Sequence, residues 1–436
     1  MGICLPIGFS LLLVSIAIAP VLIPFDGSLA QSLIEILAAM ALASVATTVR
    51  AADVNLAAQI TSRLRIAVAI PAIWMLIQLL PMPFSGMTHS IWINADEALN
   101  HRSFGHISID LGQTIQAIIF YLANIALIIV SVFAARDRRR AELVLFVLTA
   151  IATLATVLLL IARFLPAARM PFGEAGGILA AVSSLGIILS LACGTRAIER
   201  AESRRSDPSK PKPHPGKALL YAGIGLLLCL AGFVVSATFN IWLVTVFGVA
   251  AYSSVQIVRR FGLAGWATAV FVATMVIAAA MIILWRYNMG ASLSPVLEFA
   301  TAASPDAISV TRRILADTGW LGTGAGSYAQ LLPIYQELGN PITKPPSTAA
   351  AWVIELGWPM TLFVFGLGIG TIVALYRGAL VRGRDSFYSA AAAACALVLL
   401  LQAFFDASLL RTAIAVLGDA IIGLGLAQSV SRGSGS

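Results

Sequence analysis

Long apolar runs alternate with short polar stretches along almost the whole chain. A helix needs about 20 apolar residues to cross the ~30 Å hydrocarbon core of a membrane. The runs predict about twelve such helices, near residues 3–23, 30–49, 65–82, 113–135, 141–165, 177–195, 218–236, 239–257, 264–285, 349–376, 387–405 and 412–430. The alternation typical of barrel strands is absent, so we expect helices to satisfy the backbone in lipid. The predicted fold class is an all-α, polytopic membrane protein.

The composition agrees with this class. Of the 436 residues, 59% are hydrophobic and 11% are charged, whereas soluble domains carry roughly 25% charged residues. A water-soluble fold would lack the charges needed to cover its surface. The four cysteines lie singly in apolar runs and lack the spacing of metal ligands, which is typical of small buried residues. We therefore expect no disulfide framework and no metal site.

The basic residues indicate how the helices are oriented. A net charge of +8 could suggest a nucleic-acid partner, but the cations gather in short loops. These clusters follow every second apolar run, at 50–65, 136–140, 196–217, 259–260, 377–384 and Arg432. Cytoplasmic loops of membrane proteins carry such an excess of Lys and Arg. We therefore expect both termini in the cytoplasm and no nucleic-acid partner.

The longest polar interval, 286–348, then lies on the outer side. It separates helices one to nine, in residues 1–285, from helices ten to twelve, in residues 349–432. Residues 433–436 read as a possible linker tail, and the proline-rich stretch within 196–217 predicts a flexible cytoplasmic linker. Inside the outer loop, Ser304 precedes a proline and an acid, a helix-start signal, and Gly319 is a stop. We expect a short helix at about 305–318 on the membrane face.

The expected short helix carries Arg312 and Arg313, on the side where the topology does not require cations. Guanidinium groups bind phosphate or pyrophosphate in a bidentate manner, so one interpretation is an anion clamp. The other is a pair of surface cations balanced by Asp306 and Asp317. Three glycines follow, Gly322, Gly324 and Gly326. Glycine-rich turns can direct N–H groups at an anion, although most are only turns.

Titratable groups on the outer side supply candidates for proton transfer. His89, His101 and His106 lie in a second outer loop, residues 83–112. A histidine can act as a general base near neutral pH, but a solvated loop histidine is the more frequent case. Within the apolar runs, Asp419 and Glu355 are the clearest ionisable residues, and such groups are usually paired or functional.

Four short motifs resemble those of the O-antigen ligase and polysaccharide polymerase superfamily. Residues 77–83 read Ile-Gln-Leu-Leu-Pro-Met-Pro, similar to the Gln-Leu-x-Pro-Leu-Pro that ends an early span there. Residues 107–110 with Thr114 resemble the segment that follows. Arg313 and residues 319–328 resemble an Arg followed by Pro-Leu-x-Gly-x-Gly-x-Gly-x-Phe. Residues 355–357 resemble the Glu-x-Gly that opens the next span.

The resemblance implies a glycosyltransferase of the bacterial inner membrane. Such enzymes take an undecaprenyl-pyrophosphate-linked glycan as donor on the periplasmic face, bind its pyrophosphate with arginines and activate the acceptor with a loop histidine. No nucleotide, metal or other cofactor is required. Cations suit this chemistry because the leaving group is an anion. The expected partners are the membrane itself and a lipid-linked glycan or another anionic lipid.

The sequence departs from the family pattern at polar positions. Where the family has its loop His-Asn, residues 346–347 read Pro-Ser; where it has Ser-Arg, residues 236–237 read Ser-Ala; where it has Asn-x-Asn, residues 173–176 read Gly-Glu-Ala-Gly. If the protein is a divergent ligase or polymerase, the base would be His89, His101, His106 or Glu174. The pyrophosphate would then be bound by Arg312, Arg313, Arg286 and Lys344, with Gly322, Gly324, Gly326 and Glu355 as further substrate-binding residues.

Two other classes remain open. The fold could persist without transferase chemistry, as a structural or accessory subunit of a membrane complex that binds a protein partner. A transporter is less favoured, because the apolar runs show no ladder of acidic residues and no convincing repeat between the halves.

Overall fold

The computed structural model describes residues 4–24, 27–48, 66–82, 88–100, 105–164, 175–205, 216–261, 295–300, 303–336, 344–381 and 385–429. Within these ranges the chain is almost entirely helical, and the extended backbone is limited to an isolated bridge between Pro81 and His106. The expected all-α class is confirmed for this part of the chain.

The long helices follow the apolar runs. They are α1 (Cys4–Leu22), α2 (Ser28–Ala46), the helix Ile66–Leu79, α5 (Leu111–Ala134), α6 (Arg138–Phe164), α7 (Ala175–Arg205), α8 (Gly216–Ser236), α9 (Phe239–Phe261), α15 (Trp358–Val381), α16 (Ser386–Gln402) and α17 (Thr412–Ser429). In the described ranges, eight helices are long and apolar enough to cross a membrane, while segments of α1, Ile66–Leu79 and α16 are apolar but shorter. The predicted span 264–285 lies outside the described residues, so the count of about twelve stays a prediction.

The surface of these helices fits a lipid environment. Large apolar side chains such as Leu122, Leu227 and Leu362 are more than half exposed. In water such an apolar surface would promote aggregation, whereas in a membrane it contacts the apolar lipid chains. The helices therefore indicate a membrane protein. Which membrane contains it, and on which side the termini lie, stay predictions.

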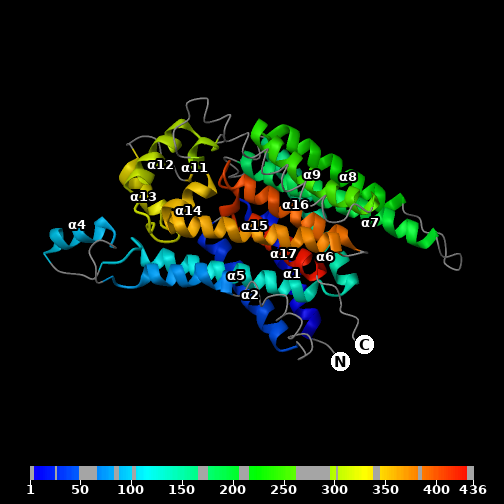
Figure 1. Cartoon of the computed structure of the whole chain (residues 1–436), viewed down its shortest axis with the longest axis horizontal. Helices are drawn as coiled ribbons and strands as arrows, with labels where there is room; N and C mark the ends of the chain where they lie inside the picture. The colour runs from blue at the N-terminus through cyan, green and yellow to red at the C-terminus, as the bar shows by residue number, and fades with distance from the viewer. Residues whose placement is uncertain are drawn as a thin grey trace.

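Helices α16 and α17 form the centre of the bundle (Figure 1). Helix α16 packs on α7, α9, α15 and α17, and α17 packs on α1 and α5. Small residues let these helices approach closely, as in other membrane bundles: Gly423 lies against Ser131 and Gly425 against Ala392. Serine hydroxyls add hydrogen bonds between helices, as from Ser131 Oγ to Ala420 O at 2.9 Å.

Shorter helices gather at one end of the bundle, here called the loop end (Figure 1). They are α4 (Ser90–Leu99), α11 (Pro295–Glu298), α12 (Pro305–Asp317), α13 (Tyr328–Tyr335), α14 (Thr348–Leu356) and the 3₁₀ helix η1 (Ser408–Leu410). Helix α12 begins as predicted, because Ser304 Oγ accepts the N–H of Ala307 at 3.2 Å. That the loop end is periplasmic stays a prediction.

One expected span is wrong as a single helix. The apolar run 349–376 is divided into α14 and α15 at Gly357, whose φ is +81°. Only glycine adopts this conformation readily, and a Cβ there would collide with the backbone of Trp320 and Leu321. The glycine-rich loop therefore packs against the break, and α14 belongs to the loop end.

The close packing of α16 on α17 gives a first prediction. We expect Gly425→Ala to lower stability by about 1–3 kcal/mol, the usual cost of overpacking, because its Cβ would collide with Ala392 and lie 2.9 Å from Leu375 Cδ2. Thermal unfolding in detergent, followed by tryptophan fluorescence, measures the effect. In the control Gly370→Ala, the added Cβ meets no described atom within 4 Å. Equal melting temperatures for the two variants would contradict this packing.

Candidate functional site

Four segments that are far apart in sequence meet at the loop end, around Gln78. This side chain is fully buried at the end of Ile66–Leu79. Its Nε2 donates to Glu355 O at 2.9 Å and to Leu321 O at 3.3 Å, and its Oε1 accepts the N–H of Ala325 at 3.2 Å. One glutamine thus joins the first motif to the glycine-rich loop and to the end of α14.

The segment 107–114 completes this unit. The N–H of Ser108 donates to Gln78 O at 3.1 Å, and the N–H of Ile109 to Thr323 O at 2.9 Å. Thr114 Oγ1 lies 2.8 Å from Ser108 Oγ and donates to Ala325 O at 3.1 Å. We call residues 78, 108–114, 321–328 and 354–357 the glycine-loop unit.

The glycines of this unit are needed for close backbone contact. Gly322, Gly324 and Gly326 have φ values of +80°, +103° and +76°, a region that L side chains rarely adopt. A Cβ on Gly322 would lie 2.5 Å from Glu355 O, and one on Gly324 would collide with Ser108. Their first role is therefore to let separate segments touch.

The amide groups of the loop are already engaged inside the protein. Residues 322 to 325 donate in turn to Gly319 O, Ile354 O, Glu355 O and Gln78 Oε1, and Ser327 donates to Gly324 O. The N–H groups of Gly326 and Tyr328 bind the carboxylate of Glu355, the latter at 3.2 Å. The anion held by the loop in this conformation is thus an acid of the same chain. Binding of a substrate by the three glycines stays a prediction.

Glu355 is the most perturbed acid of this unit. Burial of its carboxyl group raises the pKa to about 7, against the lowering effect of the N–H groups of Gly326 and Tyr328. Burial disfavours the charged form, while hydrogen bonds to the carboxylate favour it. Close to neutral pH, both protonation states of Glu355 are therefore populated.

The described histidines differ in how their rings are held. His106 Nδ1 lies 2.9 Å from Leu79 O; a carbonyl only accepts, so this nitrogen carries a proton. His89 Nδ1 instead accepts the N–H of Ile91 as the N-cap of α4, and burial lowers the pKa of His89. That either histidine acts as a base stays a prediction. His101 lies outside the described residues.

The candidate anion-binding residues lie mainly at the surface. Helix α12 buries Val310, Thr311 and Ile314 against α13 and α14, and Thr311 Oγ1 lies 2.7 Å from Tyr328 Oη. Arg312 and Arg313 fall on the remaining face and are exposed, as the 3.6-residue period requires. Lys344 is partly exposed. Arg286 and Glu174 lie outside the described residues.

A second polar cluster lies at the other end of α14, around Asp406. The N–H and Oγ1 of Thr348 donate to Asp406 O at 2.9 and 3.1 Å. Ser347 caps α14 by accepting the N–H of Ala350. The first turn of α7 also reaches this cluster, because a Cβ on Gly177 would lie 3.2 Å from Asp406 Oδ2.

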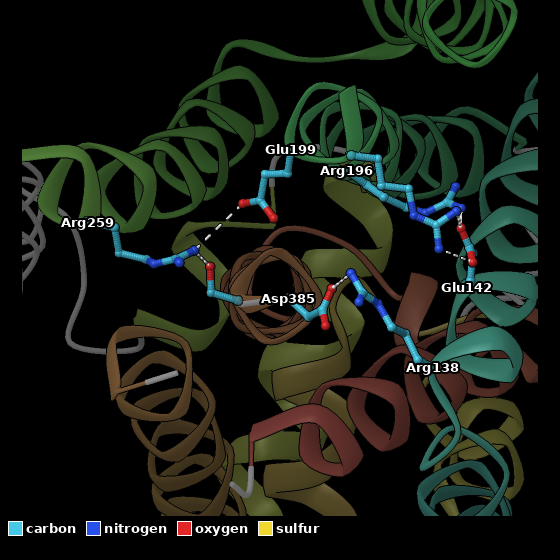
Figure 2. Close-up of polar contacts among 8 residues, drawn as sticks. Arg138, Glu142, Arg196, Glu199, Arg259 and Asp385 are labelled. Atoms are coloured by element: carbon cyan, nitrogen blue, oxygen red, sulfur yellow. Dashed lines mark hydrogen bonds and ion pairs between the residues drawn. The ribbon is translucent and has the colours of Figure 1, made fainter. Parts of the chain in front are cut away.

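Ion pairs tie helices together at the opposite end of the bundle, here called the charged end (Figure 2). Arg138 Nη2 lies 2.9 Å from Asp385 Oδ1, which joins α6 to the start of α16. Arg196 and Arg200 of α7 both bind Glu142 of α6. Further contacts join Arg259 of α9 to Ser386 and Glu199, and Arg196 to the ring of Phe146. These basic residues, expected from the sequence only to set topology, also hold four helices in place.

Comparisons with known proteins assign the chain to no family. No model of a protein family matches the chain, and no curated protein sequence matches it.

From the sequence, Asp406 was considered only as a pairing partner of Arg411, Gln402 was overlooked, and Gln78 was treated only as part of a motif. A signal was present. Each glutamine lies at the end of an apolar run, and a buried amide must find hydrogen-bond partners. The identity of those partners depends on tertiary contacts up to 277 residues away in sequence.

The role of Gln78 gives a second prediction. In Gln78→Leu, the carbonyl of Leu321 and the N–H of Ala325 lose their buried partner, while Glu355 O keeps the N–H of Gly324. At about 1–3 kcal/mol for each unsatisfied buried group, we expect a clear loss of stability, measured by thermal unfolding in detergent. The control is Gln116→Leu, since Gln116 is half-buried and its amide donates to Gln31 at 3.0 Å. A melting temperature no lower than that of the control would contradict the joining role of Gln78.

The carboxyl group of Glu355 gives a third prediction. Its pKa rises from about 4.5 in the unfolded chain to about 7 in the folded one, so raising the pH between these values favours unfolding. Glu355→Gln removes this dependence while an amide oxygen can still accept the N–H of Tyr328. We expect its melting temperature to match the wild type near pH 5 and to exceed it at pH 8. The corresponding gain in the free energy of unfolding at pH 8 is at most about 3 kcal/mol.

The control for this pH series is Glu97→Gln, because Glu97 is exposed on α4. Its melting temperature should follow the wild type at every pH. Identical pH profiles for wild type and Glu355→Gln would show that Glu355 ionises in the folded protein as it does in the unfolded chain.

Proposed function

We propose that this chain is a glycan-transferring membrane protein similar to the O-antigen ligases and polysaccharide polymerases. Its donor would be a glycan linked to undecaprenyl pyrophosphate, and transfer would take place at the periplasmic face of the bacterial inner membrane. One observation carries the proposal. The motifs on which the resemblance rests, separated by up to about 280 residues, meet in one hydrogen-bonded unit at the loop end.

The chemistry at the loop end suits an anionic leaving group. Breaking the bond between the sugar and the pyrophosphate leaves a diphosphate, and nearby cations stabilise its developing charge. Arg312 and Arg313 lie exposed on α12, beside the glycine-loop unit, and Lys344 precedes α14. The transferase would therefore work without a metal or a nucleotide.

The second candidate function is an accessory subunit of a membrane complex. Two observations favour it. Ser347 is used as a helix cap where the resembled family has its catalytic loop motif. Helix α4 has no buried residue and exposes Ile93 and Leu99, a surface that a protein partner could cover.

The fourth prediction tests the arginines. With purified protein and an undecaprenyl-pyrophosphate-linked glycan, we expect transfer to fall about 10- to 100-fold in the double variant Arg312→Ala, Arg313→Ala, since a hydrogen bond to a charged group is worth about 1.5–3 kcal/mol. Donor binding should weaken in parallel. The control is Arg377→Ala, which removes an exposed arginine near the far end of α15.

A deletion strain completes the test. It should lose polymerised or lipid-attached glycan, and the double variant should restore this glycan only in part. Normal glycan in the deletion strain, with no transfer by the purified wild type, would refute the transferase proposal. Co-purification of a stoichiometric protein partner under those circumstances would support the accessory function.

A further inference from the structure

The cluster at the N-terminal end of α14 contains a buried carboxylate with an incomplete set of partners. Asp406 is 5% exposed and Gln402 is fully buried. Gln402 Nε2 donates to Asp406 Oδ2 at 2.8 Å, and the N–H of Ser408 donates to Asp406 Oδ1 at 2.8 Å. The hydroxyl of Ser408 is a third donor that acts on this carboxylate. Two carboxylate oxygens offer about four acceptor positions, so one further hydrogen bond can be accepted.

The side chain of Gln402, which contacts this carboxylate, has an acceptor atom without a hydrogen bond in the described part of the chain. Its Oε1 is buried and has no hydrogen-bond partner among the described residues. The amide lies between Asp406 and the first turn of α7, because Nε2 also reaches to 3.5 Å from Gly177 O. An unsatisfied buried acceptor costs about 1–3 kcal/mol, so the site favours a ligand that brings a donor.

The surroundings indicate which donor fits. The α7 side is lined by Gly177, whose missing side chain lets Asp406 approach. A Cβ on Gly176, one residue earlier, would meet no described atom within 4 Å. A neutral hydroxyl can donate to both Asp406 and Gln402 Oε1 in turn, whereas a phosphate would bring a second negative charge to the carboxylate.

We propose that Asp406 accepts the proton of the acceptor hydroxyl, with Gln402 orienting the carboxylate and the hydroxyl. This role rests on the glycan transfer proposed above. As the hydroxyl oxygen bonds to the anomeric carbon of the donor, the bond from that carbon to the diphosphate breaks. The electron pair leaves with the diphosphate, and the hydroxyl proton passes to Asp406. Release of that proton to solvent restores the carboxylate.

The electrostatic environment suits a base. Burial raises the pKa of Asp406, while the hydrogen bonds from Ser408 and Gln402 lower it. The elements packed around it bring few described charges at the loop end: Glu298 on α11, Arg411 after η1, Glu355 at the far end of α14 and Asp419 within α17. The described start of α7, residues 175–195, contains no Asp, Glu, Lys, Arg or His. A carboxylate with a raised pKa accepts a proton more readily than an ordinary aspartate.

The variant Asp406→Asn tests the proposal. Its amide oxygen can still accept the N–H of Ser408, and the Gln402 amide can rotate to offer Oε1 to the new NH₂ group. We expect the rate of glycan transfer to fall about 10²- to 10⁴-fold, the usual contribution of general-base catalysis. Binding of the donor lipid, followed by native mass spectrometry, and the melting temperature should change little.

Asp385→Asn is the matched control, since it makes the same change at the other end of α16. Asp385 has a φ of +63°, which asparagine also tolerates, and it pairs with the half-exposed Arg138. This variant should transfer glycan at the wild-type rate. The conservative variant Asp406→Glu should recover part of the activity lost in Asp406→Asn, which a purely structural role would not predict.

The pH profile supplies a second readout. Wild-type turnover should fall on the acid side with a midpoint above that of an ordinary aspartate, and this limb should be lost from the residual activity of Asp406→Asn. If Asp406→Asn does not fold, the proposal is tested by the acid limb of the wild-type pH profile and by the activity of Asp406→Glu. A wild type without this limb, or an inactive but folded Asp406→Glu, would then contradict it. Transfer by a folded Asp406→Asn within about threefold of an active wild type would overturn the proposal and leave the transferase function standing. Absence of transfer by the wild type refutes both.

Discussion

The contact that the loop end depends on is the close approach of three backbones at the glycine-loop unit. Residues 321–326, the end of α14 and residues 108–109 lie within direct hydrogen-bonding distance or van der Waals contact. A side chain on Gly322 or Gly324 would hold these backbones apart. Both residues also have a positive φ, which residues other than glycine rarely adopt. Gln78 then satisfies the carbonyl and amide groups that this approach buries. Because the same contact ends α14 at Gly357, it also decides where the next membrane helix begins.

The breaking of the apolar run at Gly357 places α14 between two polar clusters. Glu355 lies eight positions after Ser347, a distance of about 12 Å along a helix at 1.5 Å per residue. One end of α14 carries the carboxylate held by the glycine loop. The other end bonds through Thr348 to Asp406. A single continuous span would have taken both ends into lipid, where such groups are costly.

Helix positions follow from the sequence because the apolar runs have the length and the caps that a helix requires. Ser304 and Gly319 predicted the short helix α12 almost to its ends. The break at Gly357 could not be predicted in the same way, since an apolar run hides the positive φ and the approaching backbone of Trp320. Nor could Asp406 be recognised, because its partners come from α7, α14 and α16.

The two carboxylates near the ends of α14 are suited to different roles. Glu355 accepts the N–H groups of Gly326 and Tyr328, and moving its carboxylate would leave these loop amides without an acceptor. Reaction there would disturb the unit that orders the loop end. The carboxylate of Asp406 is held by Ser408 and Gln402, which lie within four residues of it in sequence. It lies beside an amide oxygen that lacks a partner among the described residues. A base must change its charge during turnover without disturbing the scaffold. By that criterion Glu355 is the structural acid, and Asp406 is the one free to react.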